Sequence, residues 1–144
     1  ALIEAVKNEG AQVIVMTNAI EAQIAEFENP DDKAMFMEEY KMTEPALDRL
    51  LHSAYKLLNL LTYFTAGVQE VRAWTIHKGW RAPQAASVIH TDFEKGFIKA
   101  EVISYEDFIT YKSEAACREN GRLRIEGKEY MVHDGDVMHF RFNV

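Results

Sequence analysis

The hydrophobic positions follow two different periods along the chain, and the change falls near residue 59. Before it, apolar residues recur at helical spacing, first at Ile20, Ile24 and Phe27 and then in a leucine-rich stripe over residues 47–58. After it, apolar and polar residues alternate in short runs, as they do in strands with one buried face. The pattern therefore predicts an α+β chain with a helical first part and a mixed second part.

The first 58 residues contain one run that does not fit a helix. Residues 2–8 have the pattern of a helix end, and Gly10 suits a helix stop. The β-branched run QVIVM at residues 12–16 then predicts a short buried strand. A helix, a strand and further helices in this order predict the closing edge of a parallel α/β sheet.

Three helix starts are predicted in the same part. Asn18 and Glu21 have the spacing of a capping box, so we expect Asn18 to cap the first helix. Asn29-Pro30-Asp31-Asp32 breaks the chain and places an Asp to cap a second helix that runs through Tyr40. Glu44-Pro45 has the pattern that begins a third helix.

From residue 59 onward the pattern predicts a small sheet with one short helix over residues 84–90. The predicted strands lie near residues 61–65, 70–76, 97–103, 122–125, 130–133 and 137–142. Glu126-Gly127 and Asp134-Gly135 are typical of turns between the last strands. The final strand is the clearest, because His139 and Arg141 alternate with apolar residues.

Charge and cysteine content restrict the function only in part. Residues 1–58 carry 5 Lys and Arg against 11 Asp and Glu, whereas residues 59–144 carry 11 against 12. The second part can therefore hold a local basic patch, but a net charge of −7 gives no support to strong nonspecific nucleic-acid binding. Cys117 is the single cysteine, which excludes an internal disulfide. We interpret Cys117 as a small filler residue on a short helix, with a reactive thiol as the alternative.

Motifs for catalysis are not found in the sequence. None of the seven glycines belongs to the G-x-x-x-x-G-K-[ST] pattern of a phosphate-binding loop. The five histidines do not form H-x-x-x-H or H-E-x-x-H, so the sequence predicts no zinc site. His133 and Asp136 bracket a turn, where we expect a structural role. No apolar run approaches the ~18–20 residues that span a bilayer.

The best binding candidate is Lys78-Gly79-Trp80-Arg81, with His77 directly before it. Cations can bind phosphates while Trp80 stacks on an unpaired base. In the alternative interpretation, Trp80 caps the small core and the cations are ordinary surface residues. The sequence leaves both open. Three further cations complete one predicted basic face, namely Arg72, Lys95 and Lys99.

Three segments of the second part resemble a known domain. They are residues 70–97 (EVRAWTIHKGWRAPQAASVIHTDFEKGF), residues 98–107 (IKAEVISYED) and residues 130–144 (YMVHDGDVMHFRFNV). They are similar to the C-terminal TGS domain of the Obg-like ATPases of the YchF type. The resemblance implies that residues 59–143 form a β-grasp (ubiquitin-like) TGS domain. It also implies that residues 38–58 are a helical connector and residues 1–37 the C-terminal remnant of an OBG-type P-loop G domain.

The family implies a cytoplasmic ATPase that also binds GTP weakly, needs Mg²⁺ and associates with ribosomes or their subunits. The P-loop and the Mg²⁺-linked Asp would lie upstream. We therefore expect that this chain alone is not catalytic and holds no cofactor. Thr17, Asn18 and Ala19 match the loop that lies against the nucleotide base. His90-Thr91-Asp92 recurs across TGS domains, where His90 either anchors the following strand or lies on a surface that contacts RNA.

Two hypotheses for the function follow. In the first, the chain is the regulatory module of such an ATPase that faces RNA or the ribosome. In the second, it is a protein-interaction module that docks on its own G domain or on a translation factor without touching RNA. We expect no membrane partner and no specific DNA partner in either case.

Overall fold

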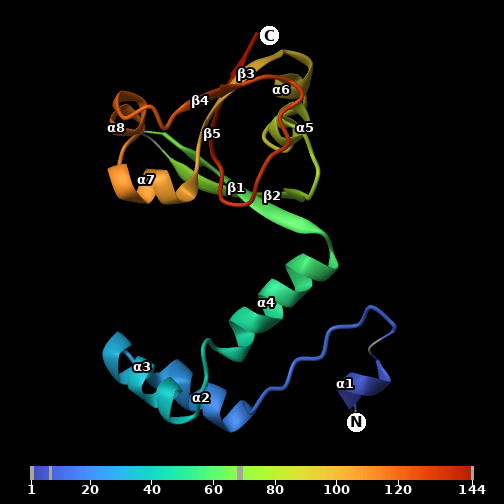
Figure 1. Cartoon of the computed structure of the whole chain (residues 1–144), viewed down its shortest axis with the longest axis vertical. Coiled ribbons are helices and arrows are strands. Elements are labelled where there is room, and N and C mark those ends of the chain that lie inside the picture. The colour runs from blue at the N-terminus through green and yellow to red at the C-terminus, as the bar shows by residue number, and fades with distance from the viewer. Residues whose placement is uncertain (1, 7, 68–69, 144) are drawn as a thin grey trace. The chain divides into compact units, whose positions relative to one another are not determined.

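The computed structural model describes residues 2–6, 8–67 and 70–143, which belong to two compact units (Figure 1). The first unit is Ala1–Leu58 and the second is Asn59–Val144. A five-stranded sheet with helices in the second unit, and helices in the first, confirm the predicted α+β class. Among the described residues, no helix has the length and apolar character that a membrane crossing requires.

The first unit is helical. Its helices are α1 (Leu2–Ala5), α2 (Asn18–Glu26), α3 (Pro30–Glu39) and α4 (Ala46–Leu57). Asn29 caps α3, because its side chain accepts a hydrogen bond from the Asp31 N–H at 2.9 Å. The prediction that an Asp caps this helix was therefore wrong. The Glu21 carboxylate accepts a hydrogen bond from the Ala46 N–H at 2.9 Å and thereby ties α2 to the start of α4.

Two further predictions for this unit were wrong. Residues 12–16 are not a strand, because a strand exists by pairing and no described residue of this unit pairs with them. Asn18 does not cap α2; it is the first helical residue, and Thr17 precedes it in extended backbone geometry. The capping-box spacing failed because Glu21 bonds Ala46 across the unit and does not fold back to its own helix start.

The second unit is built on a mixed sheet of order β2-β1-β5-β3-β4. Its strands are β1 (Leu60–Ala66), β2 (Val71–His77), β3 (Phe97–Ile103), β4 (Arg124–Glu126) and β5 (Val137–Phe142). β1 and β2 pair as an antiparallel hairpin, and β3 pairs antiparallel with β4 and β5. β5 runs parallel to β1, and among the described residues the two strands pair at Phe64 and Val137.

Helices cover parts of both faces of this sheet. α5 (Ala82–Ser87) and α6 (Thr91–Lys95) lie over the face that carries the main core, while α7 (Tyr105–Tyr111) and α8 (Glu114–Glu119) border a second apolar cluster (Figure 1). Tyr63 of β1 is fully buried, and its hydroxyl donates to the Ala85 carbonyl oxygen at 2.8 Å. This bond fixes α5 on the sheet without leaving a buried hydroxyl unpaired.

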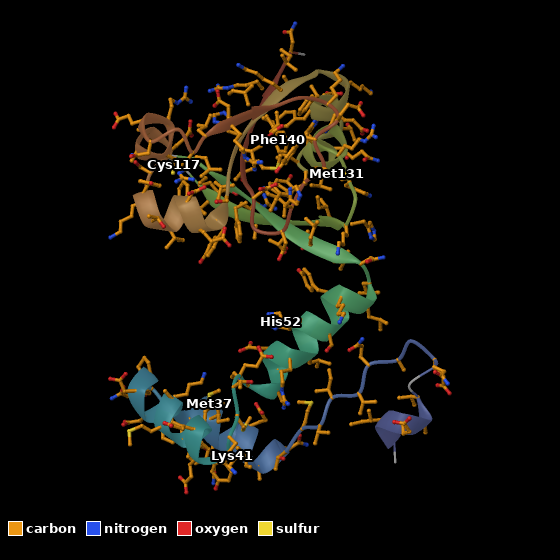
Figure 2. The ribbon with its side chains drawn as sticks, viewed as in Figure 1. Met37, Lys41, His52, Cys117, Met131 and Phe140 are labelled. Carbon is orange, nitrogen blue, oxygen red and sulfur yellow. The ribbon has the colours of Figure 1, made fainter. Side chains whose placement is uncertain are left out.

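Cys117, which is labelled in Figure 2, lies on α8. It belongs to the second cluster with Ile103 and Val137 and has no exposed surface. Burial raises the pKa of its thiol, and the nearby carboxylates of Asp107 and Glu114 raise it further. The interpretation of Cys117 as a small filler on a short helix is therefore confirmed, and the structure adds that the residue is buried.

Most strand predictions agree with the structure, but residues 130–133 are not a strand. Met131 makes only an isolated bridge with Arg81. The reason is local: the Tyr130 hydroxyl and the His133 N–H both bond the Asp136 carboxylate, which holds this segment as a loop. The predicted turn at Asp134-Gly135 is confirmed, since Gly135 has φ +82. The helix predicted over residues 84–90 ends at Ser87, and α6 and α7 were not predicted.

Candidate functional site

Residues 77–81, the strongest binding candidate of the sequence, form the corner between β2 and α5. β2 ends at His77, and the Trp80 N–H donates to the His77 carbonyl oxygen at 3.2 Å. The Lys78 N–H donates to the Asn59 carbonyl oxygen at 2.7 Å, which attaches the corner to the start of β1. Gly79 has φ +90, a conformation that residues with a Cβ rarely adopt. The backbone of the corner is therefore held at one end of the sheet.

Trp80 has a structural role in this corner. Its side chain is half-buried and packs against the main core, and its ring centroid lies 5.6 Å from that of His77. Its backbone carbonyl accepts a hydrogen bond from the Val132 N–H at 3.0 Å. These contacts support the interpretation of Trp80 as a cap on the core. Base stacking on the part of the ring that remains exposed stays a prediction.

The cations of the corner differ in their surroundings. Arg81 makes an ion pair with Glu129 in which both side chains are more than half exposed. Lys78 is exposed and has no acidic partner within ion-pair distance among the described residues. A phosphate would have to compete with Glu129 for Arg81, whereas none of the described acidic side chains competes for the Lys78 ammonium. Lys78 is therefore the cation of this corner best suited to an external anion.

The other predicted cations do not join this corner. Arg72 lies near the opposite end of β2, on the face that carries the core, where its guanidinium stacks 4.2 Å from the centroid of Trp74. Lys99 of β3 pairs with Arg141 and alternates with Ala100, which places Lys99 on the opposite face of the sheet. Lys95 lies on α6, 3.9 Å from the Asp92 carboxylate. The predicted single basic face is therefore not formed.

His90 stands at the start of a helix and not at the end of one. Its Nδ1 accepts a hydrogen bond from the Asp92 N–H at 3.2 Å, so the imidazole caps α6. The same nitrogen lies 3.5 Å from the Asp92 carboxylate. This geometry supports a structural role for His90 as the cap of α6. The side chain is also exposed, and RNA contact by His90 stays a prediction.

Thr17, Asn18 and Ala19 form the entry to α2. The Thr17 carbonyl accepts hydrogen bonds from the N–H groups of Ile20 and Glu21, both at 3.0 Å, while its side chain makes no cap bond. The N–H groups of Asn18 and Ala19 have no acceptor among the described residues. Free N–H groups at a helix start can bind a carbonyl or anionic oxygen, which is compatible with contact to a nucleotide base. This contact stays a prediction.

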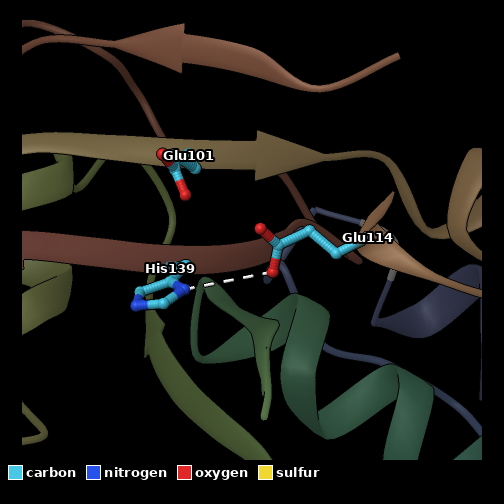
Figure 3. Close-up of side chains that lie close together, drawn as sticks. All are labelled: Glu101, Glu114 and His139. Atoms are coloured by element: carbon cyan, nitrogen blue, oxygen red, sulfur yellow. Dashed lines mark ion pairs between the residues drawn. The ribbon is translucent and has the colours of Figure 1, made fainter. Parts of the chain in front are cut away.

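A cluster on the second face of the sheet was missed by sequence reasoning. Figure 3 shows Glu101 from β3, Glu114 from the start of α8 and His139 from β5, whose ligand atoms lie within 4.8 Å of one another. The buried Glu101 carboxylate also faces the guanidinium groups of Arg141 at 3.2 Å and Arg118 at 3.5 Å. Because two arginines already neutralise Glu101, we interpret the cluster as an ion-pair network and not as a metal site.

His133 and Asp136 belong to a second network, which is centred on the buried Asp136 carboxylate. The Asp136 carboxylate accepts hydrogen bonds from the Tyr130 hydroxyl and from the His133 N–H, both at 2.8 Å, and Arg124 lies 3.7 Å away. Burial, followed by the bond to Asp136, raises the pKa of Tyr130 to about 12, so its hydroxyl remains a proton donor at neutral pH. The predicted structural role of this turn is therefore confirmed.

The chain matches one family model over residues 60–143, the YchF-GTPase_C family, whose description is "Protein of unknown function (DUF933)". A protein of Pasteurella multocida (strain Pm70), named "Ribosome-binding ATPase YchF", is 60% identical over 141 residues, which is 98% of this chain and 39% of that protein. A protein of the same name from Bacillus subtilis (strain 168) is 55% identical over 136 residues, or 94% of this chain and 37% of that protein.

A solved structure agrees with these relatives. The Schizosaccharomyces pombe YchF GTPase superposes with a TM-score of 0.79 at 38% identity, covering 97% of this chain and 37% of that chain. The chain thus spans about two fifths of the length of the proteins that it matches. The predicted resemblance to Obg-like ATPases of the YchF type is confirmed, and the chain belongs to the YchF-GTPase_C family.

Proposed function

We propose that this chain is the C-terminal, ribosome-facing portion of a YchF-type ATPase. In this proposal residues 59–143 form a TGS domain of the β-grasp type, and Lys78 at the corner between β2 and α5 contacts ribosomal RNA. The name "Ribosome-binding ATPase" carried by relatives at 55–60% identity supports the partner. The observation that supports the site is the exposed Lys78, without an acidic partner among the described residues, beside the half-exposed Trp80.

The proposal assigns nucleotide hydrolysis to residues outside this chain. The sequence has no phosphate-binding loop, and its acidic cluster at Glu101 is neutralised by arginines, so these residues do not fit a Mg²⁺–ATP site. The entry to α2 at residues 17–19 would contribute only backbone contacts to a nucleotide base. We therefore expect the isolated chain to show no ATPase activity, and turnover above the buffer rate would contradict this division of roles.

Ribosome binding through Lys78 can be tested by co-sedimentation with ribosomal particles across a salt series. Lys78→Asn removes the charge in question, and Lys112→Asn is the matched control. Lys112 is also exposed but follows α7, and its φ of 61 is one that asparagine tolerates. We expect Lys78→Asn to reduce the salt slope of binding by about one, as the loss of one phosphate contact does.

The controls decide between the two hypotheses. Equal losses in Lys78→Asn and Lys112→Asn would indicate a general charge effect and contradict the assignment of the site. Binding that hardly depends on salt would favour a protein partner, because protein docking through apolar surface releases few counterions. The proposed function places the protein in the cytoplasm, where ribosomes work.

A further inference from the structure

A concave surface lies in the second unit, at the opposite end of β2 from Lys78. It is a groove of about 700 Å³ between the end of the β1–β2 hairpin, α6 and β5. Its walls are largely apolar, with Trp74, Ile89, Phe93, Met138, Phe140 and Phe142 among the residues that form them. A volume of this size matches that of sites that take a drug-sized ligand or a few side chains. Neither the corner at residues 77–81 nor the Glu101 cluster uses this surface, apart from His139 at its edge.

The groove exists because β1 and β5 separate. Their pairing is the Phe64–Val137 pair, where the Phe64 N–H donates to the Asp136 carbonyl oxygen at 2.8 Å. Beyond this point residues of both strands line the groove. The backbone groups of a strand alternate in direction, so those of Phe140 face the same side as those of Asp136. The groove therefore runs along an edge of β5 that has no strand partner beyond Val137 among the described residues.

The chemistry of the groove favours a peptide over a nucleic acid. Phe93 and Phe142 stack on each other with centroids 3.7 Å apart, and the Arg72 guanidinium covers one face of Trp74. One face of each of these three rings is therefore already covered, which reduces the ring surface available for stacking on a base and leaves the edges and remaining faces for contact with aliphatic or aromatic side chains. At the mouth, Arg72 lies 3.7 Å from the Glu70 carboxylate, so the local charge is mixed and not the positive track that a phosphate backbone requires.

We propose that this groove binds an extended peptide segment of a partner protein. The peptide main chain pairs with the free edge of β5 near Phe140, and alternate apolar side chains enter the groove between Trp74, Phe93 and Phe142. The mixed charge of Glu70 and Arg72 at the mouth accommodates a peptide with polar residues at the intervening positions. This site is separate from Lys78 and does not depend on the ribosome contact proposed above.

The test uses the full 144-residue chain labelled with ¹⁵N and a capped peptide of alternating Thr and Leu with a Lys at each end. We expect the peptide to shift the amide resonances of Met138, Phe140 and Phe142 in the chain. A second peptide, N-methylated on one edge so that it cannot pair with a strand, should bind at least about tenfold more weakly. Absence of amide shifts in β5 at millimolar peptide, or equal affinity of the two peptides, would overturn the proposal.

Matched variants locate the site. Phe93→Ala truncates a half-buried wall of the groove, and we expect it to weaken peptide binding by about tenfold, since a few packed anchors dominate such contacts. Ile125→Ala is the control, because Ile125 of β4 is also apolar and exposed but does not line the groove. Ile89→Ala provides a second wall truncation if Phe93→Ala lowers the melting temperature.

A single-stranded oligouridylate of about ten nucleotides serves as the competing probe. If it shifts the same β5 amides and displaces the peptide, the groove is a nucleic-acid site and the proposal fails. Shifts confined to the amides near Lys78 would leave the peptide assignment of the groove intact and would support the separate RNA contact.

Discussion

The two units of this chain differ in how much apolar surface they bury by their own packing. In Asn59–Val144, twelve of the described residues form one continuous buried core, with Tyr63, Ile76 and Met138 among its largest members. In Ala1–Leu58, only Ile24 and Ala46 are buried among the apolar residues that the structure describes. The sheet unit is therefore held together by its core, whereas the helical unit depends on caps, a few ring contacts and single hydrogen bonds.

The apolar stripe of α4 remains largely exposed. Leu47, Leu50 and Leu51 lie at helical spacing, yet each keeps 43–59% of its surface exposed. Short helices are marginal in water unless an apolar face is packed. The hydrophobic period correctly predicted α4, but the period alone does not indicate whether the unit that contains this helix can cover its apolar face.

Hydrogen exchange should give the largest difference between the units. Amides in β1, β3 and β5 are expected to open only with global unfolding, whereas those in α2 and α3 open locally. We expect protection in the strands to exceed that in these helices by at least about 100-fold, which corresponds to roughly 3 kcal/mol of opening free energy. Similar protection in α2 and β3, measured by NMR on the full chain, would contradict this ranking of the two units.

Truncation of one buried isoleucine in each unit tests how much each unit depends on its buried apolar side chains. Ile76 and Ile24 are 2% and 3% exposed, so they are closely matched in chemistry and burial. We expect Ile76→Ala to lower the free energy of unfolding of the sheet unit by about 2–5 kcal/mol, from lost burial plus the cavity left behind. Ile24→Ala should leave the unfolding of that unit unchanged and reduce only the helical signal.

Urea unfolding separates these effects because the two tryptophans, Trp74 and Trp80, both lie in the second unit. Tryptophan fluorescence therefore reports the sheet unit, while far-UV circular dichroism reports both. A shift of the fluorescence midpoint in Ile24→Ala as large as that in Ile76→Ala would show that the two units unfold together.

The same contrast explains which elements could be predicted from the sequence. β3 and β5 were predicted with their observed bounds, because each is a short run rich in apolar residues, and in β5 these residues alternate with the exposed His139 and Arg141. The apolar run at residues 12–16 has the composition of a strand, but no described residue of its unit provides a partner for it. Residues 130–133 also have strand composition, and side-chain bonds to Asp136 overrode it.

The candidate sites divide in a similar way. The corner around Lys78 was predictable because Gly79 and its neighbours are adjacent in sequence. The Glu101 cluster and the groove were not predictable, since each depends on the register between β5 and a distant strand. The one local indication of the cluster was Glu101, a carboxylate that stands between the apolar residues Ala100 and Val102 of β3.

A close backbone approach in the sheet unit predicts the next largest effect. Asn143 donates its N–H to the Gly96 carbonyl oxygen at 2.9 Å, and a Cβ on Gly96 would collide with the Asn143 backbone. We expect Gly96→Ala to destabilise the unit by roughly 1–3 kcal/mol, because the end of β5 must shift away from β3. Gly127→Ala is the matched control, since a Cβ there meets no atom within 4 Å, and its urea midpoint should stay close to that of the parent.

Alkaline pH should affect the sheet unit through Tyr130. Its hydroxyl faces the Asp136 carboxylate, Arg124 and His133, and its pKa is raised from 10.0 to about 12. Because the folded pKa lies above the unfolded one, the stabilisation by protonated Tyr130 is complete below pH 10. It is lost as the pH rises from about 10 to about 12. After allowance for partial solvent screening, we expect this loss to be of order 1 kcal/mol.

Tyr130→Phe tests this assignment because phenylalanine has no proton to lose. At pH 8 the variant should be less stable than the parent, since the Asp136 carboxylate loses a 2.8 Å hydrogen bond. Between pH 10 and 12 the difference between the two urea midpoints should shrink, because only the parent gives up its protonated hydroxyl. Tyr63, whose pKa burial also raises, is present in both proteins and cancels from the difference. A difference that stays constant up to pH 12 would show that the Tyr130 hydroxyl contributes no pH-dependent stability to the sheet unit.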